Sequence, residues 1–311
     1  MKYYDVIIVG AGPMGIFTAY ELKQKAAHLN ILLIDKGQDV NHRHCPIIEG
    51  KLTQCPTDKS GYLGCKPCAM TCGFGGSGAF SDGKFNITSE FGGWLKEFIG
   101  EDELLELIHY VDGINLKFGA PNNLTDPDTK EVRDIEHRGI AKGLKLLRSH
   151  VRHVGTEINL QVLDRIAKDM AGTVDYRFLT DVDDILVEND TVKGVLLKDG
   201  SKILGDYVVL GVGRNGASWL VDSLQKHQVR FTNNRVDIGV RVETNDIVMQ
   251  EINQYLYEGK FIYNTSVGTR VRTFCSNPSG HVVIENNNGV AVVNGHSFND
   301  PKLASTNTNF A

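Results

Sequence analysis

The sequence lacks any apolar run of about 20 residues, which is the length that a membrane-spanning helix needs. We expect no signal peptide, because the first apolar stretch has the pattern of a strand and no small-residue cleavage site follows it. The sequence has no large excess of charge of either sign, since the formal net charge is only −5. That balance disfavours nucleic acid and anionic membranes as partners. These absences predict a soluble cytoplasmic protein.

Catalytic patterns of the hydrolase kind are absent as well. We find no Ser-His-Asp set, no pair of carboxylates suited to acid–base work and no internal repeat. At 311 residues the chain is longer than one compact core normally holds, so we expect two domains or an interleaved pair. Its six cysteines would be reduced in the cytoplasm, so clustered ones suggest redox or metal chemistry before structural disulfides.

The first strand, turn and helix fit a dinucleotide-binding unit. An almost continuous apolar run over residues 4–9 is typical of a strand buried on both faces of a parallel sheet. Gly10-Ala11-Gly12-Pro13-Met14-Gly15 then fits G-x-G-x-x-G, and a helix over about 13–27 follows. A second strand over 31–34 ends in Asp35. The glycine spacing alone would be weak evidence for a dinucleotide site. A strand, a glycine turn, a helix and a second strand that ends in an acid, in this order, are strong evidence.

Each part of this unit has a physical task. Gly10 permits the tight turn, Gly12 lets a pyrophosphate approach the backbone, and Gly15 lets helix and strand pack closely. The helix N-terminus offers unpaired N–H groups to the anion. Asp35 lies about 20 positions past Gly15, where a carboxylate takes both hydroxyls of an adenosine ribose. We include the adjacent Lys36 in the predicted site.

A second glycine run, Gly211-Val212-Gly213-Arg214-Asn215-Gly216, also fits G-x-G-x-x-G. One interpretation is a separate site for NAD(P)H, but no strand ending in an acid follows at the proper distance. The other interpretation rests on the preceding meander, which turns at Asp199-Gly200 and ends in Gly-x-Gly-Arg. This block resembles the second flavin-domain signature of two-dinucleotide-binding-domain flavoproteins, in which Gly211, Gly213 and Arg214 would close over the same FAD. We favour the second interpretation.

The resemblance extends along nearly the whole chain. The segment from Cys65 to Lys84, with Ser81-Asp82-Gly83-Lys84 as its most specific block, is similar to a loop of a family of uncharacterised FAD-dependent dehydrogenases. Three further segments are similar to that family: His153–Thr156, Asp237–Glu243 and Val271–Cys275. The resemblance implies an FAD-dependent oxidoreductase of unknown substrate. Members usually continue to a Gly-Asp segment that this sequence lacks, which predicts a fragment or truncated product.

The glycine-rich loop over 73–84 supplies the candidate flavin contacts. We expect Gly75, Gly76 and Gly78 to line the ring, because glycine lets the backbone approach a planar group closely. Ser81 or Asp82 would bond to it. Lys84 is the candidate catalytic residue, as a cation near the flavin N1–C2 edge that stabilises the reduced form. The alternative is a surface turn with a solvated lysine.

Two further contacts complete the predicted FAD site. Arg43 could reach a phosphate of the cofactor. By resemblance alone, the backbone at Val182 would meet the adenine.

The cysteines allow three interpretations. Cys65-x2-Cys68-x3-Cys72, with Cys55 upstream, could bind zinc or an iron–sulfur cluster. They could instead form a redox dithiol beside the flavin. The third interpretation is a set of reduced, partly buried thiols.

The predicted fold class is α/β. A doubly wound, Rossmann-like FAD-binding domain would combine residues 1–90 and 151–227, and an interleaved mixed α+β substrate domain would combine 91–150 and 228–311. We expect helices over 94–100, 103–118 and 137–151, turns over 119–136, and a strand over 236–242.

The predicted function is hydride transfer from a small-molecule substrate through flavin N5 to an unknown electron acceptor, with NAD(P)H as a possible transient partner. Three alternatives stay open: an NAD(P)-dependent enzyme or sensor without flavin, a flavoprotein acting on RNA, and a non-catalytic FAD-binding scaffold.

Overall fold

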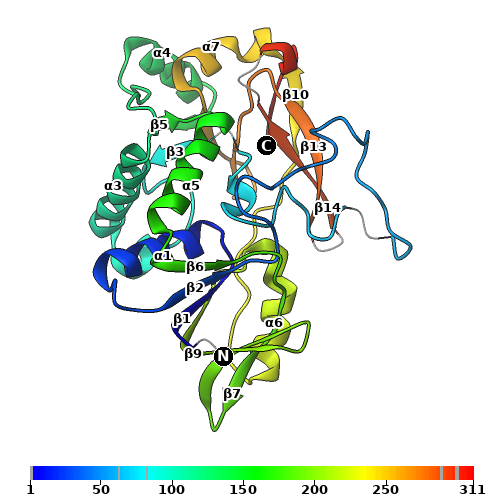
Figure 1. Ribbon diagram of the computed structural model, residues 1–311. Helices are drawn as coiled ribbons and strands as arrows, with labels where there is room; N and C mark the ends of the chain where they lie inside the picture. The colour runs from blue at the N-terminus through cyan, green and yellow to red at the C-terminus, as the bar shows by residue number, and fades with distance from the viewer. Residues whose placement is uncertain (1–2, 62–63, 82, 288–289, 298–300) are drawn as a thin grey trace. The chain divides into compact units, whose positions relative to one another are not determined.

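The computed structural model describes residues 3–61, 64–81, 83–287, 290–297 and 301–311, and it forms two compact units (Figure 1). Unit 1 consists of Met1–Phe80, Leu160–Arg235 and Asn286–Ala291. Unit 2 consists of Ser81–Asn159, Val236–Glu285 and Val292–Ala311. Both units are therefore assembled from separated stretches of chain.

Unit 1 contains a six-stranded mixed sheet in the order β6-β2-β1-β9-β8-β7. The strands are β1 (Tyr3–Val9), β2 (Ile31–Ile34), β6 (Val174–Arg177), β7 (Val182–Glu188), β8 (Thr191–Leu197) and β9 (Lys202–Leu210). The first four in spatial order run parallel, whereas β7, β8 and β9 form an antiparallel meander. Figure 1 shows β1 and β2 from the N-terminus beside β6 and β9 from mid-chain.

The two neighbouring strands β1 and β2 are largely apolar, as expected of parallel strands that are covered on both faces. All four residues of β2 are buried, and Ile7 and Ile8 of β1 have no exposed surface. The helices of this unit are α1 (Pro13–Lys25), the greater part of α5 (Thr156–Met170) and α6 (Ala217–Lys226). The α/β class with a parallel sheet is thus confirmed.

Unit 2 is a mixed α+β body. Its helices are α2 (Lys96–Ile99), α3 (Glu101–Lys117), α4 (Lys130–Ile140) and α7 (Asp246–Leu256). Its pairings are β3 (Lys84–Ile87) with β5 (His150–His153), β10 (Val242–Asn245) with β15 (Asn307–Phe310), and β11 (Lys260–Asn264) between β4 (Leu144–Leu147) and β12 (Arg270–Arg272). β13 (His281–Asn287) pairs with β14 (Val290–His296), and each strand has residues assigned to both units.

A buried ion pair holds α3 against β5 within unit 2. The Arg152 guanidinium donates to both carboxylate oxygens of Asp112, at 2.7 and 2.8 Å, and its side chain is only 2% exposed. Removal of either partner would leave an uncompensated buried charge, which is costly. Among the described residues, no helix is long and apolar enough to cross a membrane.

The predicted helix over 137–151 is right only for 137–140, which end α4, and wrong for the rest. The chain leaves α4 at Ile140, turns through Gly143 with φ +75°, and enters β4 and then β5. The apolar spacing suits a helix, but β4 pairs with β11, more than a hundred residues further on. That long-range pairing overrides the local period. The predicted turn region over 119–136 holds for 119–129 but is wrong for 130–136, because α4 begins at Lys130, where the Thr129 side chain caps it.

The predicted strand over 236–242 is also wrong in most of its length. Its apolar residues Val236, Ile238 and Val240 are 79%, 93% and 75% exposed, and β10 begins only at Val242. The helix α7 that follows was not predicted, although Asn245 caps its N-terminus by accepting from the Ile247 N–H.

Asp184 anchors α6 to β7 and generates a prediction about stability. This carboxylate is 7% exposed and accepts hydrogen bonds from Ser223, Lys226 and His227. Burial alone would raise the pKa of Asp184, but these donors outweigh it and hold the pKa below its ordinary value. Its contribution to stability is therefore present above the unfolded pKa of about 4 and is lost as the pH falls through the folded pKa.

We expect Asp184→Asn to lower the free energy of unfolding by about 1–3 kcal/mol at neutral pH, because donors including a lysine lose a charged acceptor. The loss should shrink steadily as the pH is lowered below about 4. Urea unfolding across pH measures it, with Asp222→Asn on the same helix as the control. An equal loss at every pH would contradict this role.

Candidate functional site: a dinucleotide cradle in unit 1

The three glycines of the first run differ in how much space lies beside the Cα atom. A Cβ atom built at Gly10 would lie 2.4 Å from the Gly211 carbonyl oxygen, and Gly10 has φ +103°. A Cβ at Gly15 would lie 1.9 Å from the Gly10 oxygen. At Gly12, by contrast, the nearest atom is the Gly76 Cα at 4.0 Å. Gly10 and Gly15 therefore serve backbone packing, and Gly12 leaves space for a ligand.

This open glycine is the N-cap of α1. Its position has no side-chain cap, Pro13 begins the helix, and no acidic residue lies in the first turn. The last turn carries Lys23 and Lys25, which suit the negative end of the helix dipole. A helix start whose N–H groups have no side-chain cap is suited to bind a phosphate.

Asp35 ties three backbone segments together. One carboxylate oxygen accepts from the Ala11 N–H at 2.8 Å, and the other accepts from Gly37 at 2.7 Å and Gly73 at 2.8 Å. The carboxylate therefore faces the first glycine turn. Since a carboxylate offers about four acceptor positions, about one remains for a ribose hydroxyl, where the sequence predicted two.

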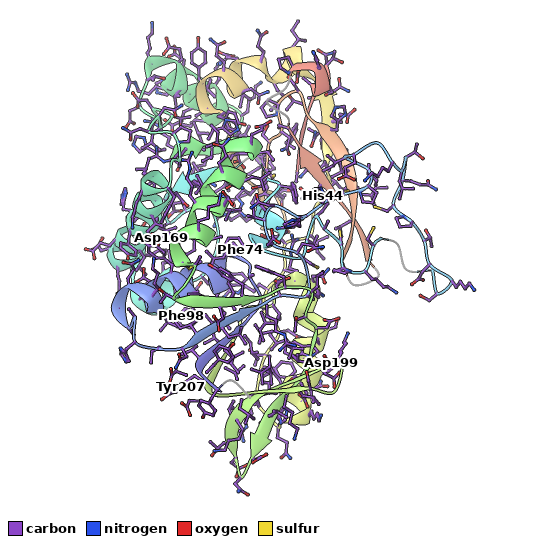
Figure 2. All side chains as sticks on the ribbon, viewed as in Figure 1. His44, Phe74, Phe98, Asp169, Asp199 and Tyr207 are labelled. Carbon is purple, nitrogen blue, oxygen red and sulfur yellow. The ribbon has the colours of Figure 1, made fainter. Side chains whose placement is uncertain are left out.

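The loop after Cys72 lies against this turn. The Gly75 N–H donates to Ala11 O at 2.8 Å, and the Phe74 N–H donates to Gln38 O at 3.0 Å. Phe74 is 1% exposed and meets Tyr176 and Phe178 edge-on, and it is labelled in Figure 2. The buried ring and two backbone bonds fix the loop over the start of α1.

The predicted glycines of the loop also differ in how much space lies beside the Cα atom. A Cβ at Gly75 would lie 2.7 Å from Leu163, and one at Gly76 would lie 3.1 Å from the Gly12 Cα. Gly78 has no atom within 4 Å of such a Cβ. Gly78 is therefore the loop glycine that leaves open space, whereas Gly75 and Gly76 allow the loop to pack closely.

Arg43 is directed to this loop. Its guanidinium donates to the carbonyls of Ala69 and Phe74 and lies 4.9 Å from the centre of the Phe80 ring. The residue is 4% exposed, and burial lowers the pKa of Arg43 to about 10 against the opposing charge of Asp35. In this structure Arg43 braces the loop, so its predicted phosphate contact gains no support.

A cavity of about 130 Å³ lies at the carboxyl ends of β1 and β2. β2 and β9 flank β1 on opposite sides, and the crevice at such a reversal of strand order is where α/β sheets bind ligands. The cavity is lined by Val9, Gly10, Ile34, Asp35, Lys36, Thr180, Asp181, Val182, Lys198, Val212, Asn215, Gly216 and Trp219. Of the predicted site residues, the cavity is lined by Gly10, Asp35, Lys36 and Val182, whereas Gly211, Gly213 and Arg214 of the second run are not in its lining.

The second glycine run packs directly on the first. The Gly211 N–H donates to Val9 O at 2.7 Å, and a Cβ at Gly211 would lie 3.0 Å from the Met14 side chain. Lys36 bonds to Asn215. Gly213 has φ +59° and open space beside it, and Arg214 is exposed. The two runs are therefore in direct contact within unit 1.

Most residues of the lining were not among the predicted site residues, and two of these make side-chain hydrogen bonds beside the cavity. Trp219 donates its indole N–H to Asp183 O at 2.7 Å, and Asn215 bonds to Lys36 and Thr71. Their signal was available, since both belong to the glycine run and the first turn of the helix that follows it. Lys198, also in the lining, carries no such signal.

The remaining loop candidates fall in unit 2. The Ser81 hydroxyl accepts from the Gly83 N–H at 3.3 Å, and Asp82 lies outside the described residues. The Lys84 side chain is 8% exposed and donates to Ser276 O. Lys84 is therefore not a solvated surface lysine.

Among the described residues, the structure gives no support to a metal site at the cysteines. All six thiols are free, and among the described residues no three His, Cys, Asp or Glu side chains are placed to hold a metal ion. Burial, followed by neighbouring thiols, raises the pKa of Cys55 and Cys65, and burial raises that of Cys72. Raised values disfavour a preformed reactive thiolate. Zinc, an iron–sulfur cluster and the ligand set Cys55, Cys65, Cys68 and Cys72 stay predictions without support.

Comparisons with known proteins complete the description. No protein-family model matches the sequence, and no curated protein matches it. L-amino acid deaminase from Proteus vulgaris is similar over 88% of this chain and 61% of its own, at 16% identity and a TM-score of 0.42. A form of that enzyme lacking its specific insertion is similar over 86% and 67%, at 14% identity and a TM-score of 0.42.

Glycine oxidase from Geobacillus kaustophilus is similar over 96% of this chain and 74% of its own, at 15% identity and a TM-score of 0.42. The chain thus spans less than two thirds of the complete deaminase chain. At these scores and identities the likeness does not assign this chain to a family.

Proposed function

We propose that the protein is an FAD-dependent oxidoreductase whose unit 1 holds the cofactor. The observation that carries this proposal is the Asp35 carboxylate, which joins the dinucleotide turn to the glycine loop beside the open space at Gly12. An acid after β2, an uncapped helix start and a glycine with room beside it are the groups that bind an adenosine diphosphate moiety.

Each part of the cofactor has residues suited to it. The start of α1 and Gly12 would take the pyrophosphate, and Asp35 would accept from a ribose hydroxyl. The cavity beside Val182 would hold the adenosine end. Gly78, with open space at its Cα, is the loop position that best suits a flat ring.

One shared cavity favours FAD over two separate nucleotides. Gly10 of the first glycine run and Asn215 and Gly216 of the second all line it. A second dinucleotide would need a second acid-ended strand, and the sequence offers none after residue 216. We therefore propose no resident NAD(P)H.

The flavin, when bound, would accept a hydride at N5 from a small-molecule substrate and pass electrons to an acceptor. The chain's own part is to orient the cofactor through Asp35 and the loop that Arg43 braces. We propose further that unit 1 is a doubly wound cofactor domain and that unit 2 is the interleaved substrate domain.

The experiment is a measurement of bound flavin. The purified protein should carry FAD, and Gly12→Val should lose it while keeping its circular dichroism spectrum, because the added side chain occupies the space that the pyrophosphate needs. Gly239→Val is the control, since Gly239 is exposed and has no atom within 4 Å of an added Cβ. Full FAD content in Gly12→Val, or none in the wild type after addition of FAD, would contradict the proposal.

Lys84 yields a second, electrostatic prediction. A buried ammonium that acts on the anionic reduced flavin would raise its midpoint potential. Lys84→Met should therefore lower the potential by on the order of 30 mV, the two-electron equivalent of about 1.4 kcal/mol. Redox titration against reference dyes measures it, with the more exposed Lys96→Met as the control. An unchanged potential would remove Lys84 from the account.

A further inference from the structure

The segment over 236–242 in unit 2 has the sequence of a strand, but most of it pairs with no other strand. Its backbone is extended up to β10, since it makes no helix, turn or bend and none of its residues has a left-handed φ. Among the described residues, no backbone group over 236–241 takes part in a backbone hydrogen bond. Val236, Ile238 and Val240 are 79%, 93% and 75% exposed. Unpaired backbone groups beside exposed apolar side chains are a template for an added strand.

This segment runs directly into β10, which Figure 1 labels. Among the described residues, the strand partner of β10 is β15 alone, so the two form a two-stranded antiparallel sheet. A two-stranded sheet is marginal by itself, and a third or fourth strand stabilises it. The edge of β10 that faces away from β15 is therefore the place where a further strand can be added.

Charged and apolar residues alternate strictly over 235–243. The even positions are apolar, and they are Val236, Ile238, Val240 and Val242. The odd positions carry charges on both sides of a glycine, and they are Arg235, Asp237, Gly239, Arg241 and Glu243. Successive residues of a strand face opposite sides, so the apolar residues share one face and the charged residues share the other. Read backwards, the order of the charges is the complement of itself.

Two copies of the segment can therefore pair antiparallel about Gly239 with every position complementary. Residues directly opposite each other in an antiparallel pair lie on the same face and interact. Each opposite pair joins an acid to a base or one apolar residue to another, and the pairs are Arg235–Glu243, Val236–Val242, Asp237–Arg241 and Ile238–Val240. Cross-strand pairs of both kinds stabilise a sheet.

The other registers lack this match. A shift by two residues sets Arg235 opposite Arg241 in one direction and Asp237 opposite Glu243 in the other, and like charges directly opposite are destabilising. A shift by one residue brings the apolar face of one copy to the charged face of the other. A parallel pairing in register places each charge beside another of the same sign. The sequence thus favours one orientation and one register.

The central charges have little opposing charge within the chain. The Arg241 guanidinium donates to the Cys275 carbonyl and to three asparagine side chains, which are all neutral acceptors, and among the described residues it has no carboxylate partner. The Asp237 side chain is 99% exposed, and its carboxylate lies 3.6 Å from the Arg272 guanidinium. The carboxylate of a second copy would give Arg241 a charged acceptor.

We propose that the segment over 235–243 joins two copies of this chain as antiparallel strands, with the two-fold axis at Gly239. The pairing uses the open edge of β10 and connects the β10–β15 sheets of both copies into one four-stranded sheet. A two-fold interface places the same surface on both copies, which a self-complementary sequence provides. The contact is small beside a standard interface of about 1,600 Å², so the dimer should dissociate on dilution. Its formation does not depend on the proposed flavin binding.

The first test is sedimentation of the whole chain over a range of concentrations, with and without added FAD. We expect a reversible monomer–dimer equilibrium in both conditions. Ile238→Lys should weaken association at least about tenfold, because the ammonium is solvated in the monomer and meets Val240 in the dimer. Val267→Lys is the matched control, since Val267 lies in the same unit and is 85% exposed. A monomer at every soluble wild-type concentration, or wild-type association of Ile238→Lys, would overturn the proposal.

The second test exchanges charges to read the register. Arg235 and Glu243 are both exposed, so Arg235→Glu and Glu243→Arg should each keep the monomer fold. Each variant alone sets like charges opposite each other and should associate at least about tenfold more weakly than the wild type at low ionic strength. An equimolar mixture restores two opposite-charge pairs and should form the heterodimer, and added salt should reduce the difference. A mixture that associates no better than either variant alone would contradict this register.

Discussion

Unit 1 depends on one carboxylate that accepts hydrogen bonds from three separate backbone segments. Asp35 takes the N–H groups of Ala11, Gly37 and Gly73, so the first glycine turn, the end of β2 and the loop after Cys72 are fixed together. Buried N–H groups need acceptors, and a charged acceptor makes stronger bonds than a neutral one. The open space at Gly12 and the cavity beside Val182 exist because these three segments are held in place.

The loop over Gly73–Gly78 is supported from its other side by Arg43. A buried guanidinium bonded to carbonyls, with Asp35 as a neighbouring charge, is an expensive way to hold a loop. The proposed function accounts for that cost, because a loop that presents glycine backbone to a ligand has few side chains for its own packing, and Phe74 is the buried one here. Asp35 and Arg43 thus hold the same loop, Asp35 through the Gly73 N–H and Arg43 through the Phe74 carbonyl.

The sequence predicted what neighbouring residues determine. The unit from β1 to β2 follows from apolar runs and glycine spacing, and the β7–β9 meander follows from alternation around Asp199-Gly200. The region from Lys130 to Val151 could not be predicted in this way, because β4 is a strand only through its pairing with β11. Nor could the sequence show that Arg43 turns to carbonyls, or that Tyr257 meets His153 across 104 positions of chain. Sequence motifs identified the glycines of the two runs, whereas the contacts of the charged and aromatic side chains could be seen only in the structure.

The central claim is that unit 1 binds the adenosine diphosphate half of FAD, and its most direct test is a calorimetric competition experiment. Apoprotein prepared by removing bound flavin is titrated with FAD, FMN and ADP. If Asp35, Gly12 and the cavity beside Val182 bind the adenosine diphosphate half, ADP should bind and compete with FAD, and FMN should bind far more weakly than FAD. Equal binding of FMN and FAD, with no competition from ADP, would contradict the account.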